Sequence, residues 1–196
     1  NPRGVLAVSS LIKLPIVTAQ KSSIVFFQYL SAMAYTKAIL EYDEKCQMIP
    51  VKIKWPNDIY IMLPEYIGKK IDTSKQDVTH AKIGGILVNT NLIGKTYHLV
   101  VGAGLNVGNE SPTTSLNKVV DAINAHYGES IEHFQSEKLL AKYLSIFNAM
   151  IEKFKMTGFK PFLEEYYNLW FHSNQIVTMY DQADMKAQVT GITPDW

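Results

Sequence analysis

The stretch from residue 51 to residue 61 constrains the fold most, because its pattern is that of a strand, a tight turn and a second strand. Apolar residues alternate with Lys52 and Lys54, the alternation stops at residues 55–58 (WPND), and it resumes at residues 59–61. The proline biases the residue before it towards an extended backbone, and Asn and Asp favour turns. The stretch therefore predicts a hairpin whose turn brings a cation, an indole, an amide and a carboxylate close together. Taken alone, this turn is more typical of a hairpin with a packed Trp and a structural Asp than of a functional site.

The composition is that of a folded globular protein. The chain has 196 residues, of which 47% are hydrophobic and 19% charged, so it is long enough to bury a real core. The net charge is only +1, with 19 basic and 18 acidic side chains. This balance gives no electrostatic case for nucleic acid or an anionic membrane as the main partner.

Cysteine and histidine usage argues against a metal centre and for a reducing compartment. Cys46 is the single cysteine, which excludes an internal disulfide and a cysteine-based metal site. The histidines are scattered without metal-ligand spacing, so no protein metal site is predicted. No apolar run reaches the ~20 residues of a membrane span, and residues 1–4 do not begin a signal peptide. We therefore predict a cytoplasmic protein without a membrane segment.

Hydrophobic periodicity predicts an α+β fold with a mixed or antiparallel sheet packed by helices. Lysine-rich residues 64–80 lack periodicity and indicate a surface excursion between two strands. The predicted strands are 5–14, 51–54, 59–63, 83–88 and 97–101, with a hairpin connection over 89–96, and a weaker pair at 175–180 and 186–192. The predicted helices are 22–41, 116–126, 136–157 and 161–171.

Two glycine-bearing strands carry the remaining polar features. Lys82 heads a strand and is followed by Gly84 and Gly85, which permit a ligand or another backbone to approach closely. This pattern fits an anion site and, equally, a surface lysine with a bulge behind it. Gly102 and Gly104 do not form G-x-G-x-x-G, and the chain has no G-x-x-x-x-G-K-[ST] loop. Any use of ATP must therefore follow another route.

Four ordered blocks resemble the biotin protein ligases, also called holocarboxylase synthetases. The blocks are KWPND at 54–58, KIGGILVN at 82–89, GAGLNV at 102–107 and PTTSLN at 112–117. The resemblance extends from residue 1 to about residue 180, and Asn89 favours the eukaryotic branch of the family.

The resemblance implies an enzyme that joins biotin to ATP as biotinyl-5'-AMP and passes the biotinyl group to a lysine on the carrier domain of a carboxylase. Magnesium would accompany the ATP phosphates without a dedicated protein cage. Lys82 aligns with the active-site lysine of the family, whose ammonium would offset charge where carboxylate and phosphate meet. Asp58 is the candidate that orients or deprotonates the acceptor lysine.

The other site residues follow from the same resemblance. Asn106 aligns with a residue that reads the adenine edge through its amide, and Trp55 and Asn57 are assigned mainly to site architecture. Residues expected to form the floor beneath biotin and its adenylate are Gly84, Gly85, Leu87, Gly102 and Gly104.

The resemblance also sets the expected domain organisation. Residues 1–171 match the catalytic domain without its N-terminal part, and 172–196 match the start of a small SH3-like β-barrel. The arginine- and glycine-rich loop that covers the adenylate in the family would lie before Arg3, so we expect the isolated chain to bind and turn over substrates weakly.

Two other functions remain possible. A lipoate or octanoate ligase or transferase of the same superfamily shares the Asn-Asp turn and a following lysine, although residues 55–56 and 83–88 favour biotin. A non-catalytic module that docks a carrier domain is the second alternative, and it would not depend on Lys82.

Overall fold

The computed structural model describes residues 3–19, 24–71, 76–111, 113–182 and 184–193. The strands are β1 (Val5–Pro15), β2 (Val51–Lys54), β3 (Asp58–Met62), β4 (His80–Ile93), β5 (Thr96–Asn106), β6 (Ile176–Met179) and β7 (Met185–Gln188). The α-helices are α1 (Ile16–Ala19), α2 (Phe26–Leu40), α3 (Gln76–Thr79), α4 (Leu116–Tyr127), α5 (Ser136–Thr157) and α6 (Leu163–Leu169). Short 3₁₀ turns are η1 (Glu44–Met48), η2 (Pro64–Tyr66), η4 (Lys160–Phe162) and η5 (Tyr180–Gln182).

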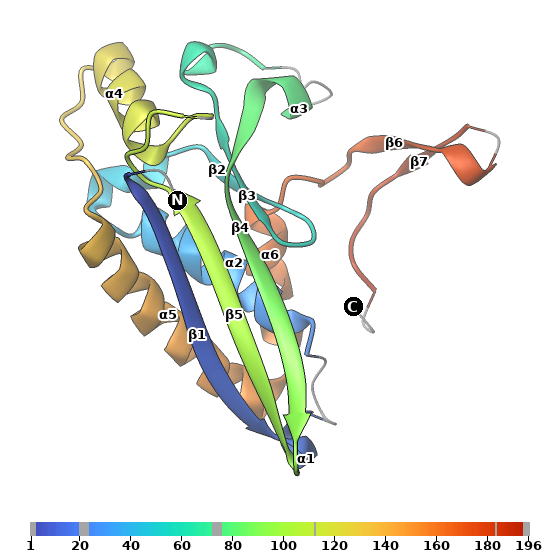
Figure 1. Ribbon diagram of the computed structural model, residues 1–196. Helices are drawn as coiled ribbons and strands as arrows, with labels where there is room; N and C mark the ends of the chain where they lie inside the picture. The colour runs from blue at the N-terminus through green and yellow to red at the C-terminus, as the bar shows by residue number, and fades with distance from the viewer. Residues whose placement is uncertain (1–2, 20–23, 72–75, 112, 183, 194–196) are drawn as a thin grey trace.

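Five strands form one sheet in the order β1-β5-β4-β3-β2, and every neighbouring pair is antiparallel. β1, β5 and β4 are the longest strands and lie side by side (Figure 1). The predicted α+β class and the predicted hairpin of β2 and β3 are confirmed. The β4–β5 connection is much shorter than the predicted 89–96 loop: the strands continue to a turn at Gly94, whose φ of 62° favours glycine. The hydrophobicity pattern conceals the extension of β4, because three exposed polar residues, Asn89, Thr90 and Asn91, interrupt the apolar run.

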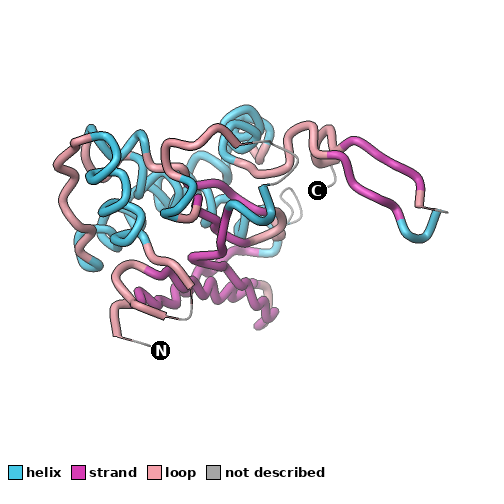
Figure 2. The backbone as a smooth tube through the Cα atoms, turned by 90° about the horizontal axis from the view of Figure 1, so that it is seen from above, coloured by secondary structure: helices cyan, strands magenta, loops and turns pink. Residues whose placement is uncertain are grey.

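The helices cover one face of the sheet, and α2 lies at the centre of that layer. Figure 2 shows the long strands along one side of the molecule and the helices only above them. α2 is buried around most of its circumference, because it packs between the sheet and α5. α5 meets it with an apolar stripe, and Phe154 on that stripe contacts the ring of Phe27 edge-on at a centroid distance of 5.3 Å. The predicted buried helix and the predicted amphipathic helix are both confirmed.

Replacing Phe154 with alanine is expected to lower the free energy of unfolding by about 3–5 kcal/mol, because it removes a fully enclosed ring from the α2–α5 contact. The matched control is Met156→Ala on the same helix, where the side chain is 79% exposed and the change should stay within about 0.5 kcal/mol. Urea denaturation followed by circular dichroism measures both. Equal effects of the two substitutions would contradict the placement of α5.

The last helix and the C-terminal strands differ partly from the sequence pattern. The predicted helix 161–171 becomes η4 followed by α6, which ends at Leu169 because Trp170 leaves the helix and forms a parallel bridge with Ile53. β6 and β7 form a separate two-stranded antiparallel sheet, as their alternation predicts. This hairpin projects from the side of the main body (Figure 1).

Candidate active site

The face of the sheet opposite the helices carries a row of glycines on two neighbouring strands, β4 and β5. Alternation along β5 turns Gly102 and Gly104 to this open face, while the alternate residues Val101 and Ala103 are buried against the helices. Gly104 lies opposite Gly85 on β4, and Gly102 lies opposite Leu87. These positions form a strip of backbone with few side chains, bordered by the neighbouring strand β1. We call the strip formed by Gly85, Gly102 and Gly104 the glycine trough.

Packing does not require glycine at two of these positions. A Cβ atom added to Gly104 would meet no atom within 4 Å, and one added to Gly102 would first meet atoms at 3.8 Å. Neither residue has a positive φ angle, so the backbone conformation does not require glycine either. The missing side chains therefore leave open space above the sheet, which suits a ligand lying against the backbone.

A β-bulge turns Lys82 towards the same face. Tyr60 of β3 pairs with Lys82 and Ile59 pairs with Gly84, so Ile83 is an extra residue on β4. Without this insertion, strict alternation from Gly85 would send the Lys82 side chain into the helix layer. The bulge considered at this position in the sequence is therefore present, and it places the lysine at the trough.

Lys82 and Asp58 form an ion pair beside the trough. Lys82 Nζ lies 2.5 Å from Asp58 Oδ1, and the two side chains are 51% and 26% exposed. A Cβ on Gly85 would lie 3.1 Å from that carboxylate oxygen and 3.2 Å from Lys82 Nζ. Glycine at position 85 thus gives the pair room to lie over the strand. An accessible ammonium and an adjacent carboxylate therefore lie next to the glycine trough. The ammonium of Lys82 can bind an anion, and the carboxylate of Asp58 can accept a proton.

Gly84 and Leu87 occupy different sides of β4. Gly84 is buried, and a Cβ there would lie 2.8 Å from both Gly104 O and Leu105 Cδ1. Its placement in the ligand floor is therefore corrected: the strand packing requires glycine at position 84, on the helix side of the sheet. Leu87 is on the open face and 68% exposed, so it can contact a ligand in the trough.

Trp55 and Asn57 hold the turn that carries Asp58. Asn57 Nδ2 donates to Ile86 O at 2.7 Å, and Ile86 N donates to Asn57 O at 2.8 Å, which fastens the turn to β4. Trp55 Nε1 donates to the hydroxyl of Tyr29 on α2 at 2.9 Å. Both side chains therefore hold the turn in place by hydrogen bonds. Burial raises the pKa of the Tyr29 phenol, an effect that the Trp55 hydrogen bond partly offsets.

Asn106 ends β5 and holds the loop before α4. Its Nδ2 donates to Thr113 Oγ1 at 3.2 Å and to Thr114 O at 3.3 Å. Thr113 Oγ1 in turn donates to Lys82 O at 3.2 Å, which ties this loop to the start of β4. Both amide hydrogens of Asn106 are thus engaged, so contact with a nucleotide base is left to Oδ1. Pro112 of the fourth block lies outside the described residues.

Tyr29 and His172 are the site-supporting residues that sequence reasoning missed. Tyr29 belongs to a helix with a general apolar pattern, and His172 lies far along the chain from the turn. The sequence offers no local signal for either contact, because both depend on how distant elements pack together.

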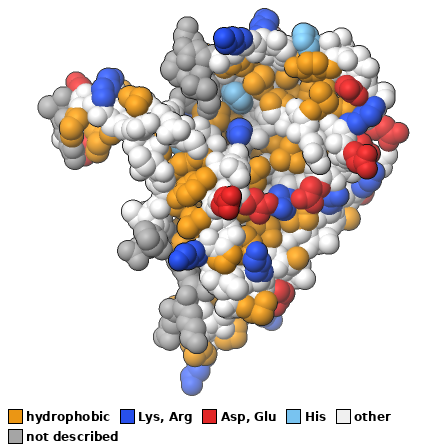
Figure 3. Space-filling model, turned by 180° about the vertical axis from the view of Figure 1, so that it is seen from behind, with side chains coloured by type: hydrophobic (Ala, Val, Ile, Leu, Met, Phe, Trp, Pro, Cys, Tyr) orange, Lys and Arg blue, Asp and Glu red, His pale blue; other side chains and the backbone are white. Residues whose placement is uncertain are grey.

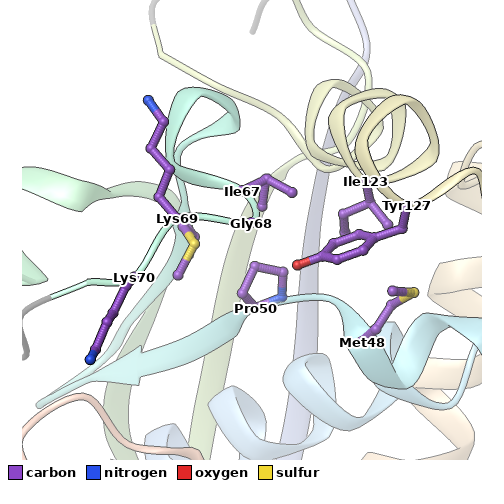
Figure 4. A pocket seen from close by; sticks show the side chains of 9 residues that line it. Met48, Pro50, Ile67, Gly68, Lys69, Lys70, Ile123 and Tyr127 are labelled. Carbon is purple, nitrogen blue, oxygen red and sulfur yellow. The ribbon is translucent and has the colours of Figure 1, made fainter.

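A separate hollow of about 420 Å³ lies between η1, η2 and α4. Figure 4 shows Tyr127 and Ile123 facing Pro50 across it, while Lys69 and Lys70 point outwards. None of the predicted site residues is among the described residues that line this hollow. The charged pair on the open face, Lys82 and Asp58, therefore does not belong to this hollow.

Other surface features give no second chemical centre. No group of three or more His, Cys, Asp or Glu side chains within the described part of the chain could hold a metal ion. On the helix side, acidic and basic side chains are interleaved rather than segregated (Figure 3). Among the described residues, no helix combines the length and the apolar character that crossing a bilayer requires.

Comparison with solved structures shows the class of fold to which this chain belongs. The chain superimposes on the crystal structure of the biotin protein ligase from Aquifex aeolicus with a TM-score of 0.67, covering 97% of this chain and 72% of that one at 19% identity. It thus has the fold of a biotin protein ligase catalytic domain. The model of the biotin/lipoate A/B protein ligase family matches residues 1–106, and the chain belongs to that family.

Two curated relatives are similar over nearly the whole chain. The biotin–protein ligase of Schizosaccharomyces pombe is 39% identical over 197 residues, which cover 100% of this chain and 30% of that protein. The biotin–protein ligase of Homo sapiens is 29% identical over 192 residues, covering 98% of this chain and 24% of that protein. The chain therefore spans less than a third of the length of either relative.

Proposed function

We propose that this chain supplies the catalytic-domain residues of an ATP-dependent biotin–protein ligase, a carbon–nitrogen ligase that releases AMP and diphosphate. The observation that carries the proposal is the Lys82–Asp58 pair beside the glycine trough on the open face. The relatives support it, since the similar fission yeast and human proteins are both biotin–protein ligases. A solved ligase that holds biotin and ATP shares the fold, with a TM-score of 0.65.

In the first step, a biotin carboxylate oxygen attacks the α-phosphorus of ATP. The bond from that phosphorus to the bridging oxygen breaks, and diphosphate leaves. Negative charge gathers on phosphate and carboxylate oxygens as they meet, and the Lys82 ammonium lowers its energy electrostatically. The carboxylate needs no general base, because it is already ionised at neutral pH. The exposure of Lys82 leaves its ammonium accessible to both anions.

In the second step, the acceptor lysine of a carboxylase carrier domain attacks the carbonyl of biotinyl-5'-AMP. An unperturbed lysine has a pKa of about 10.4, so its amine must lose a proton before it attacks. Asp58 orients this amine and takes the proton, while AMP leaves with the bonding electron pair. The position of Asp58 directly beside Lys82 supports this role, because the proposed anhydride forms next to the Lys82 ammonium.

The nucleotide contacts follow from the loop geometry. The adenine amino group donates to Asn106 Oδ1, the atom of that amide not committed to Thr113 and Thr114. Magnesium would accompany the ATP phosphates and offset their charge, and Asp58 is the nearby carboxylate that would help to hold it. Biotin lies over Gly102 and Gly104, with its apolar part against Leu87.

The domain assignment and location belong to the same proposal. Residues 1–171 form the catalytic domain and 172–196 begin a small SH3-like domain, supported by the separate β6–β7 sheet. The enzyme works in a reducing compartment such as the cytoplasm, supported by the single buried thiol of Cys46.

Biotin-dependent ATP–pyrophosphate exchange in the complete natural polypeptide tests the function. We expect exchange with biotin and no exchange with lipoate or octanoate at the same concentration, because the relatives act on biotin by name. Exchange driven by lipoate or octanoate would favour the superfamily alternative. Absence of exchange with all three acids, together with binding of a carrier domain, would favour a docking module.

A further inference from the structure

The end of α6 and the residues that join it to β6 lie along the outer edge of β2. Lys52 Nζ donates to Asn168 O at 3.0 Å, and Phe171 N donates to Ile53 O at 2.7 Å. Trp170 forms a parallel bridge with Ile53. This segment, residues 168–175, is called the edge segment. The edge segment lies alongside β2, the strand that leads into the Trp55–Asp58 turn, so it can influence the position of that turn.

His172 makes the contact with the turn itself. Trp55 N donates to His172 Nε2 at 3.1 Å, and His172 Nδ1 lies 2.7 Å from Gln175 Oε1. A backbone N–H can only donate, and an amide oxygen can only accept. The imidazole therefore carries its proton on Nδ1 and is neutral when both bonds are formed. Gln175 fixes this tautomer and orients the ring.

Gln175 also connects His172 to the C-terminal hairpin. Val189 N, just after β7, donates to Gln175 O at 2.9 Å, and Asn174 N donates to Val189 O at 3.2 Å. A continuous series of hydrogen bonds thus runs from the hairpin through Gln175 and His172 to the backbone of Trp55. Three residues further on, Asp58 meets Lys82.

We infer that His172 is a positioning residue: its Nε2 fixes the backbone at Trp55 so that the turn presents Asp58 to Lys82, and it links the β6–β7 hairpin to the site. This inference rests on the proposed function for its catalytic meaning. The turn has other anchors at Tyr29 and Ile86, so loss of His172 should loosen its geometry without unfolding the chain. A displacement of about 1 Å at a reacting group can cost up to ~100-fold in rate.

The test compares His172→Leu, which removes the acceptor, with His172→Gln, whose amide oxygen can replace Nε2. His133→Leu is the matched control, because it removes another surface histidine that contacts Asp121 at 2.7 Å, away from the turn. Each variant is made in the complete natural polypeptide. The readouts are kcat and KM for biotin in ATP-dependent biotin transfer to a carrier domain, the reaction that includes the step assigned to Asp58, and the hydrogen exchange rate of the Trp55 amide.

We expect His172→Leu to lower kcat about tenfold, with KM for biotin changed less than about threefold, since binding surfaces stay in place. The Trp55 amide should exchange at least about tenfold faster in this variant. His172→Gln should restore both quantities to within about threefold of the unsubstituted protein, and His133→Leu should change neither.

Three results would overturn the inference. An unchanged kcat in His172→Leu would show that the contact has no effect on the reaction. A Gln variant as impaired as the Leu variant would show that the acceptor atom is not what matters. An unchanged Trp55 amide rate would show that the hydrogen bond does not hold the turn. If the unsubstituted protein shows neither ATP–pyrophosphate exchange nor biotin transfer, the proposed function is wrong, and the Trp55 amide rate still tests the His172 contact on its own.

Discussion

Replacing Lys82 with glutamine is expected to lower biotin-dependent ATP–pyrophosphate exchange by about 10²–10³-fold while the protein remains folded. Glutamine keeps the length and polarity of the side chain but loses the positive charge that offsets the meeting carboxylate and phosphate. Lys82 is half exposed and its ion pair with Asp58 is solvated, so stability should change by less than about 1 kcal/mol. The complete polypeptide is assayed with saturating ATP and biotin, and circular dichroism reports folding.

Lys13→Gln is the matched control for this experiment. Lys13 is an exposed lysine on the same open face, opposite His98 near the far end of β1. Its loss removes the same charge from the same sheet, so any general electrostatic effect should appear in both variants. Exchange by the Lys82 variant equal to that of the Lys13 variant would contradict the assignment of Lys82 to the reaction.

Replacing Gly104 with valine is expected to weaken biotin binding by about 10–100-fold, because the new side chain occupies the space assigned to the ligand. A Cβ at this position meets no protein atom within 4 Å, and valine suits a strand, so the free energy of unfolding should change by less than about 1 kcal/mol. Titration calorimetry with biotin and urea denaturation measure the two quantities. Unchanged affinity would show that the trough is not the biotin site.

Gly84→Ala is the opposite case and serves as its comparison. Its Cβ would lie 2.8 Å from Gly104 O and Leu105 Cδ1, so this single methyl should cost about 1–3 kcal/mol of stability through strand displacement. Glycine at position 104 is thus expected to leave space for the ligand, whereas glycine at position 84 is required by the packing of β4 against β5. A stable Gly84→Ala variant with a normal urea midpoint would contradict the packing described for β4 and β5.

Local patterns predicted the elements whose signals lie within the chain segment itself. The alternation around the Trp-Pro-Asn-Asp turn predicted the β2–β3 hairpin, and the apolar stripe ending at Gly158 predicted α5. The glycines beside Lys82 indicated close approach of a ligand or backbone, and the backbone approach occurs at Gly84, where an added Cβ would lie 2.8 Å from Gly104 O. The family resemblance, confirmed by the match over residues 1–106, then supplied the chemistry of these positions.

Features that depend on distant partners could not be predicted in this way. The bulge at Ile83 decides which side of the sheet Lys82 faces, but bulges depend on the partner strand and have no firm sequence signal. The anchoring of Trp55 by Tyr29 and His172 brings together residues 26 and 117 positions apart. The length of β4 was underestimated because residues 89–93 continue the ladder without burying a face, and that of β5 because Gly102 and Gly104 interrupt its apolar pattern before it ends at Asn106.

Glycine amide shifts provide the most direct measurement of the central claim, which is that the adenylate lies on the open face of the sheet. The isotope-labelled chain is titrated with a non-hydrolysable analogue of biotinyl-5'-AMP, and its amide spectrum is recorded by nuclear magnetic resonance. We predict that Gly85, Gly102 and Gly104 shift together, while Gly128 and Gly158 at the helix ends do not. Shifts concentrated instead at Gly68, in the hollow beside α4, would contradict the site described here.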